Sequence, residues 1–154
     1  MHDTPMKRTC PTRGARDKAA KDLGRAGEDA ACAFLRKKGF CLVERNWRPT
    51  GPHRGLELDI VARTGDILVF VEVKTRADAA RIPVIAAFGA GKQKKMLAAA
   101  RQYLATQDAW HCLCRFDLVC VCGDANSGFQ IEHYENVIEN GQTLGGGNTS
   151  WQPW

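Results

Sequence analysis

Charged residues interrupt two neighbouring apolar runs of this chain. Glu57 and Asp59 lie in the first run, and Glu72 and Lys74 lie in the second. Both runs are rich in β-branched residues and are expected to form strands, where charge is rarely accepted without a site. Carboxylates on one strand face can hold a hard divalent cation, and a nearby lysine can stabilise charge developing on a phosphate. The pattern is typical of metal-dependent phosphodiester hydrolysis; the alternative is a surface hairpin with solvated charges.

A short turn between the two runs predicts a β-hairpin. We place this turn at residues 64–65, where Gly65 supplies a permissive backbone. A two-residue loop there sets Glu57 opposite Glu72 with Asp59 diagonal to it, whereas a bulge or longer loop brings Asp59 directly opposite. Either way, the carboxylates converge within roughly 4.5–8 Å, which is unfavourable unless a cation or a proton lies between them. Asp59, Glu72 and Glu57 are therefore the predicted ligands of Mg²⁺ or Mn²⁺.

Helices and further strands are predicted around this hairpin. Apolar periodicity predicts helices at 15–38 and 92–107, and strands at 40–48, 57–62, 67–74, 115–122 and 128–134. The longest apolar strand, 67–74, is expected at the centre. Together they describe an α/β fold with a mixed central β-sheet flanked by helices. Glu28 falls at the edge of the first helix's apolar stripe, where it either reaches a cleft beside the sheet or is an ordinary boundary residue.

Length and charge narrow the class of protein. The 154 residues fit a single domain at 16–136, with a disordered basic N-terminus at 1–15 and a flexible Gly-rich tail at 137–154. The net charge of +5 favours a polyanionic partner. No apolar run approaches the roughly 20 residues of a membrane helix, and no secretory signal is visible. We therefore expect a cytoplasmic protein that does not associate with a membrane.

The chain has seven cysteines, four of which form two C-x-C pairs that are expected to pack in the core. The odd number of cysteines argues against a disulfide framework. The pairs Cys112/Cys114 and Cys120/Cys122 suggest zinc, but zinc sites usually separate paired cysteines by two to four residues. In an apparent strand, cysteine behaves as a small buried hydrophobe, which is the interpretation we favour.

Several basic and aromatic residues are suited to holding a nucleic acid. Residues 45–48 combine two cations, an amide and an indole ring, a mixture suited to phosphates and bases. The alternative is a core tryptophan between solvated arginines. Arg76 follows Lys74 closely, and Lys92 begins the second predicted helix, where a solvated helix face is the alternative. The predicted nucleic-acid-binding residues are Arg45, Asn46, Trp47, Arg48, Arg76 and Lys92.

An ordered series of blocks resembles a known bacterial family. The blocks include residues 24–28, 45–48, 57–62, 68–76 and 115–117. They look like the YraN family of uncharacterised proteins, of the restriction-endonuclease-like superfamily that includes Holliday-junction resolvases. The resemblance covers about residues 22–134. One departure is Leu56, which stands where the family usually has glycine.

The resemblance implies roles for particular residues. It implies a restriction-endonuclease-like core, with Asp59 and Glu72 as metal ligands and Lys74 as the catalytic lysine. Glu28 matches an acidic helix position that serves as an accessory ligand to metal or water. Gln93, or Lys92 beside it, matches a helix position that often assists at the site.

These observations lead to competing functional hypotheses. The first is a Mg²⁺-dependent endonuclease that hydrolyses DNA phosphodiester bonds, with branched or damaged DNA as candidate substrates. The second is a non-catalytic nucleic-acid-binding module that keeps the nuclease fold and acts through partner proteins. A scaffold role is the third. A homodimer is compatible with the first hypothesis, because two symmetric cuts need two sites.

Overall fold

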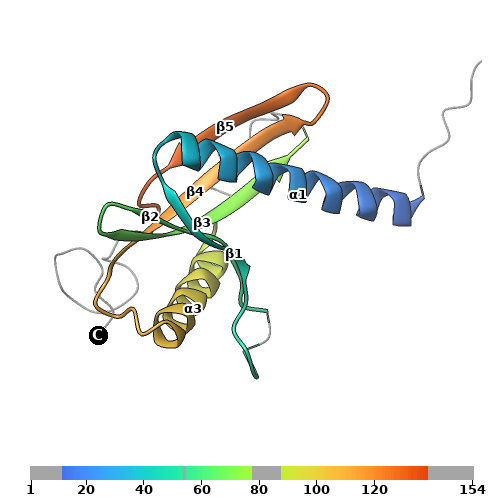
Figure 1. Ribbon diagram of the computed structural model, residues 1–154. Coiled ribbons are helices and arrows are strands. Elements are labelled where there is room, and N and C mark those ends of the chain that lie inside the picture. The colour runs from blue at the N-terminus through green and yellow to red at the C-terminus, as the bar shows by residue number, and fades with distance from the viewer. Residues whose placement is uncertain (1–11, 54, 78–87, 139–154) are drawn as a thin grey trace, which may run out of the picture.

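The computed structural model describes residues 12–53, 55–77 and 88–138 of the chain (Figure 1). Within these residues the fold is α/β, as predicted. Its elements, in chain order, are α1 (Arg13–Lys37), β1 (Cys41–Trp47), β2 (Leu58–Thr64), β3 (Ile67–Arg76), α3 (Ala90–Thr106), β4 (Leu113–Asp124) and β5 (Gly128–Tyr134). None of the helices in this part of the chain is long and apolar enough to cross a membrane.

The strands form one mixed sheet with β3 at its centre. Their order in the sheet is β1-β2-β3-β4-β5. Only β3 and β4 pair in parallel among the described strands, and the other neighbours are antiparallel. A parallel pair requires a crossover connection, and α3 lies in that crossover. The mixed sheet and the central position of the longest apolar strand confirm the predicted architecture, which is compatible with a restriction-endonuclease-like core.

The two described helices cover opposite faces of the sheet. Side chains along β3 alternate between the two core layers that lie under these helices. Phe70 packs with Tyr103 of α3, with 5.7 Å between the ring centroids. Val69 and Val71 instead belong to the cluster that contains Leu35 of α1. The alternation continues along β3, so Glu72 and Lys74 lie on the α3 face, at the end where that helix begins.

The predicted domain limits shift slightly. Helix α1 already begins at Arg13, inside the segment predicted to be disordered. At the other end, the Val137 N–H donates to the Phe116 carbonyl at 2.8 Å, and Ile138 is buried. Both residues therefore belong to the domain and not to the predicted tail. The rest of the predicted N-terminal segment and of the tail lies outside the described residues.

Three of the four described cysteines of strand β4 and the turn before it are core residues, whereas Cys122 is only partly buried and Cys41 of β1 is exposed. Cys112, Cys114 and Cys120 are buried in the layer between the sheet and α3. Burial raises the pKa of the Cys114 and Cys120 thiols to about 12, which keeps them protonated at neutral pH. Core packing is therefore the role that their environment supports.

Candidate active site

The β2–β3 hairpin turns one residue later than the sequence pattern predicts. Thr64 pairs with Ile67, so the two loop residues are Gly65 and Asp66 instead of residues 64–65. Gly65 adopts a φ of +55° at the first loop position, a conformation that glycine takes without steric cost. Both placements put Gly65 in the loop, which is why the sequence pattern does not distinguish them.

The observed register brings together the two carboxylates of interest. Ile60 pairs with Val71, and the next step of the same register sets Asp59 opposite Glu72. Asp59 Oδ2 accepts a hydrogen bond from the Val73 N–H at 2.8 Å. This bond holds the Asp59 carboxylate against the end of the β3 backbone, beside Glu72.

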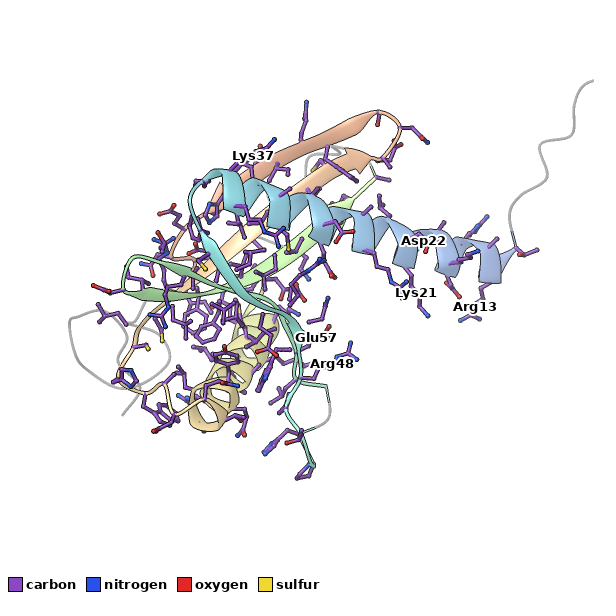
Figure 2. All side chains as sticks on the ribbon, in the orientation of Figure 1. Arg13, Lys21, Asp22, Lys37, Arg48 and Glu57 are labelled. Carbon is purple, nitrogen blue, oxygen red and sulfur yellow. The ribbon has the colours of Figure 1, made fainter. Side chains whose placement is uncertain are left out.

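Glu57 is not brought to Glu72. It precedes β2, and its Oε2 accepts a hydrogen bond from Arg48 Nη2 at 3.0 Å. Figure 2 shows the labelled Glu57 and Arg48 side chains close together beside the β1–β2 connection. The prediction of Glu57 as a metal ligand depended on the predicted register, and the structure replaces it with an ion pair.

The Asp59 carboxyl group has an unusually high pKa. Burial and then repulsion by Glu72 raise the pKa of Asp59 to about 7, against an ordinary value of 3.8. The Val73 hydrogen bond and the positive charge of Lys92 act in the opposite direction, but they are too weak to cancel this effect. Within the chain, the charge of Asp59 is thus only partly compensated.

Glu72, in contrast, is neutralised by two lysines. Its side chain is only 4% exposed, and Lys74 Nζ and Lys92 Nζ each lie 2.9 Å from its Oε1 atom. Both lysine side chains are about one-third exposed, so their ammonium groups also reach solvent. Gln93, the neighbouring candidate, instead donates from Nε2 to the Phe88 carbonyl at 2.9 Å. Lys92 is therefore the α3 residue at the site.

A close helix–strand contact brings Glu28 to the site. A Cβ atom on Gly27 of α1 would lie 2.0 Å from Thr75 Oγ1 of β3, so only glycine fits this approach. The next residue, Glu28, is close enough for its negative charge to raise the pKa of Asp59. The structure thus brings Glu28 near the predicted ligands, as expected for an accessory position.

The end of β1 holds Glu28 from the other side. Asn46 adopts a φ of +50°, a left-handed conformation that asparagine tolerates, and its Nδ2 donates to Glu28 Oε2 at 3.1 Å. Arg45 Nη2 donates to Asp29 at 2.7 Å and lies 4.0 Å from Glu28 Oε2. These two predicted nucleic-acid-binding side chains are engaged with acidic residues of α1.

Trp47 lies in the core, which was the alternative interpretation. It is 7% exposed and packs edge-on against Tyr103, with 5.2 Å between the ring centroids. A ring buried in this way has no free face for a base, so we withdraw it as a stacking residue. Arg48 is 69% exposed despite its pairing with Glu57, and Arg76 lies partly exposed at the end of β3.

The donor set fits a magnesium or manganese ion. Asp59 and Glu72 supply hard oxygen ligands, and Mg²⁺ is usually held by one or two carboxylates together with water and substrate phosphates. The incompletely compensated charge of Asp59 is the observation that favours a cation here. Among residues 12–53, 55–77 and 88–138, no cluster of three or more His, Cys, Asp or Glu side chains is suited to hold a metal.

Comparison with known proteins gives the chain a family. The family model described as "Uncharacterised protein family UPF0102" matches residues 27–121. The chain belongs to this family. The result confirms the resemblance to the YraN family, and the matched UPF0102 span contains Glu28, Asp59, Glu72, Lys74 and Lys92.

Individual UPF0102 proteins match most of the chain. A relative from Nitratidesulfovibrio vulgaris strain DP4 is 47% identical over 131 residues, covering 85% of this chain and 94% of the relative. A relative from Lawsonia intracellularis is 36% identical over 133 residues, covering 86% and 97%. A relative from Desulforapulum autotrophicum is 42% identical over 117 residues, covering 76% and 93%.

Proposed function

We propose that this protein is a Mg²⁺- or Mn²⁺-dependent endonuclease that hydrolyses phosphodiester bonds in DNA. The observation that carries the proposal is the juxtaposition of Asp59 and Glu72, with Lys74 on the same Glu72 carboxylate. Two carboxylates sheltered from solvent and a partly exposed lysine at the end of a central strand are suited to phosphoryl chemistry. Membership in an uncharacterised family is compatible with this activity.

Each side chain would have a distinct role in the reaction. Asp59 and Glu72 would hold the metal, which when bound supplies charge to polarise a phosphate and lowers the pKa of a water. The Val73 N–H fixes the Asp59 carboxylate in place before substrate binds. Lys74 has an ammonium group at the solvent boundary, where it can donate to a phosphate oxygen as charge develops. Glu28 would orient water near Asp59.

Cleavage of a panel of labelled DNAs tests the proposal. Duplex, flap, four-way junction and single-stranded DNA would be incubated with Mg²⁺ or Mn²⁺ and wild type, Asp59→Ala or Lys74→Ala protein. The matched control is Asp66→Ala, which removes an exposed carboxylate at the far end of the same hairpin. We expect Lys74→Ala to slow cutting roughly 100-fold or more, Asp59→Ala to abolish it and Asp66→Ala to leave it unchanged. Cutting by Asp59→Ala at the wild-type rate would show that this site is not catalytic.

A specific contact supports a second candidate function. Lys74 and Lys92 already neutralise Glu72, so this carboxylate has a balanced charge without any cation. A nucleic-acid-binding module that keeps the fold without turnover would have such a site. It predicts salt-dependent DNA binding, no cleavage of any DNA in the panel, and no heat of Mg²⁺ or Mn²⁺ binding by calorimetry. Metal-dependent cleavage would exclude it.

A further inference from the structure

Helix α1 extends well beyond the sheet that it covers. All of its buried residues lie at Gly27 or later, whereas every residue from 12 to 22 is exposed. Figure 1 shows the first half of the helix projecting away from the strands. At 1.5 Å per residue, residues 13–22 form an extension of about 15 Å. Packing against the described part of the domain therefore does not account for this half of the helix.

The composition of the projecting half suits a polyanion better than a second protein surface. Residues 13–25 contain five basic and two acidic residues, which gives this short stretch a net charge of +3. The whole chain has a net charge of +5, so more than half of it comes from residues 13–25. The uncharged residues between Arg13 and Asp22 are glycine and alanine only. Residues 13–22 have no large apolar side chain to bury against another copy of the chain, and Leu23 beyond them is partly buried, so charge is the main means of recognition of this stretch.

Four of the basic residues, Arg13, Lys18, Lys21 and Arg25, fall within about 80° of Glu28 around the helix axis. Lys18, Lys21 and Arg25 are the three of these that lie nearest to Glu28 along the chain. Glu28 follows Gly27, whose backbone closely approaches Thr75 of β3, the residue after Lys74. In Figure 2, Lys21 extends from the edge of α1 that is nearer to Arg48 and Glu57 in this view. We call Lys18, Lys21 and Arg25 the arm cations.

The arm cations are available, whereas several other cations near the site are already paired. Among the described residues, no ion pair or hydrogen bond engages the side chains of Lys18, Lys21 or Arg25. Arg45 and Arg48, in contrast, are paired with carboxylates of α1 and of the β1–β2 connection. A phosphate that contacts an arm cation does not have to displace an internal carboxylate, so binding there is less costly.

We propose that residues 13–25 of α1 form a nucleic-acid-binding arm whose Lys18, Lys21 and Arg25 contact the phosphate backbone beside the cleavage site. The inference rests on the proposed function for the identity of the bound strand. Residues 13–25 span about 20 Å at roughly 1.5 Å per residue, which is long enough to follow about six base pairs of a duplex at roughly 3.4 Å per base pair. The positive end of the helix macrodipole lies at the tip of the arm and adds to the attraction for phosphate.

A matched pair of double variants tests the arm. Lys21→Ala/Arg25→Ala removes one lysine and one arginine from the arm, and Arg36→Ala/Lys37→Ala removes the same two residue types from the exposed C-terminal end of the same helix. Affinity for a labelled duplex would be measured in EDTA by fluorescence anisotropy from 50 to 200 mM salt. We expect the arm variant to bind on the order of tenfold more weakly, with a salt slope lower by about 2. The control variant should bind within about twofold of wild type.

Other outcomes overturn the arm. Equal weakening in both variants would show a general charge effect, and unchanged binding by the arm variant, or no DNA binding by wild type, would also contradict the proposal. A changed oligomeric state of the arm variant with unchanged DNA binding would assign the arm to a second copy instead. Cleavage measured in parallel separates the two proposals. If Asp59→Ala abolishes cutting while the arm variant binds DNA normally, the proposal of the arm is contradicted and that of the endonuclease is not. If the arm variant binds DNA weakly but none of the proteins cuts DNA, the proposal of the endonuclease is contradicted and that of the arm is not.

Discussion

Asp59 and Glu72 face each other, but the chain compensates their charges unequally. Glu72 has two ammonium groups at 2.9 Å, whereas Asp59 has one backbone N–H and a pKa raised to about 7 by burial and by Glu72. A divalent cation would therefore bring the larger gain at Asp59. Lys74 and Lys92 would be released from Glu72 to the extent that a cation replaces them.

Metal binding should accordingly depend on Asp59. We expect Mg²⁺ or Mn²⁺ to raise the melting temperature of wild type, with about 2.7 kcal/mol of stabilisation at a metal concentration 100 times the Kd. Asp59→Asn keeps the size of the side chain and removes its charge, so the metal-induced shift should disappear. Differential scanning fluorimetry with and without metal measures this shift. Asp66→Asn is the control, and an equal shift in all three proteins would argue against a metal at Asp59.

The sequence singles out residues that the structure brings together at the candidate site, but it does not predict how they pair. Asp59, Glu72 and Lys74 interrupt apolar strands, and that contrast is visible in one sequence. The hairpin register is not, because Gly65 fits a loop at either of two positions. The two-residue loop at 64–65 predicts Glu57 opposite Glu72, which is wrong, and the structure has Asp59 opposite Glu72 through a two-residue loop at 65–66. The contact of Lys92 with Glu72 depends on how α3 is rotated over the sheet, which tertiary packing decides.

At the scale of elements, the contact between α1 and β3 sets the position of Glu28. Gly27→Ala would place a Cβ 2.0 Å from Thr75 Oγ1, so the helix would have to move away from the strand. We expect a loss of about 1–3 kcal/mol in the free energy of unfolding, measured by urea denaturation.

A second glycine of the same helix provides the control. A Cβ atom on Gly24 would meet no other atom within 4 Å, so Gly24→Ala should stabilise the helix by about 0.5–1 kcal/mol. Opposite signs for the two substitutions would confirm the close approach. If Gly27→Ala were stabilising as well, α1 would not contact β3 as closely as the structure shows.

A buried ionic cluster ties the ends of β4 and β5 together. Asp117 is fully buried and accepts two hydrogen bonds from Arg115, both at 2.9 Å. His133 Nε2 lies 2.9 Å from its carboxylate, and the Asn136 N–H donates to it at 3.0 Å. A carboxylate can only accept here, so Nε2 of His133 carries the proton. Burial alone would raise the pKa of Asp117, but these hydrogen bonds outweigh it and lower the pKa below 3.8.

The cluster should make stability depend on acid pH. Because the folded-state pKa of Asp117 is depressed, its contribution is present above the unfolded value near 3.8 and is lost as pH falls through the folded value. Asp117→Asn should cost about 3–5 kcal/mol at pH 7, with a smaller difference from wild type at pH 3. Urea denaturation at both pH values measures this.

Glu135→Gln is the matched control for that experiment. Glu135 is 49% exposed and pairs with Lys38 at 3.5 Å and Arg115 at 3.3 Å, so its removal should cost less than about 1 kcal/mol. A penalty for Asp117→Asn that is the same at both pH values would show that its charge is not what stabilises the cluster.

Elements were more predictable than the contacts between them. The strand predicted at 128–134 coincides with β5, and the period of α1 is clear enough to predict most of its length. The cluster around Asp117 joins residues up to 19 positions apart and leaves no local signal. Trp47 is a second example of a contact that the local sequence does not predict. The arginines near it in the sequence are the same whether its ring packs against Tyr103 or faces solvent.

For the whole molecule, the candidate site and the arm present opposite charges to the same substrate. The arm cations attract a phosphate backbone, whereas the incompletely compensated carboxylate of Asp59 repels the phosphate that must approach it. A divalent cation between Asp59 and Glu72 would reverse the local repulsion. Metal and DNA should therefore bind cooperatively, although each has its own contacts.

This cooperativity can be measured as a coupling between two ligands. We expect Mg²⁺ to tighten binding of a cleavage-resistant phosphorothioate duplex by about 5- to 10-fold in wild type, at constant ionic strength. By linkage, the duplex should tighten Mg²⁺ binding by the same factor, which calorimetry can check independently. In Asp59→Asn the coupling should vanish, and DNA binding without metal should be slightly tighter than in wild type, because one repelling charge is gone. Equal DNA affinity with and without Mg²⁺ in wild type would mean that the phosphate does not approach Asp59, and the arm would then direct DNA to another surface.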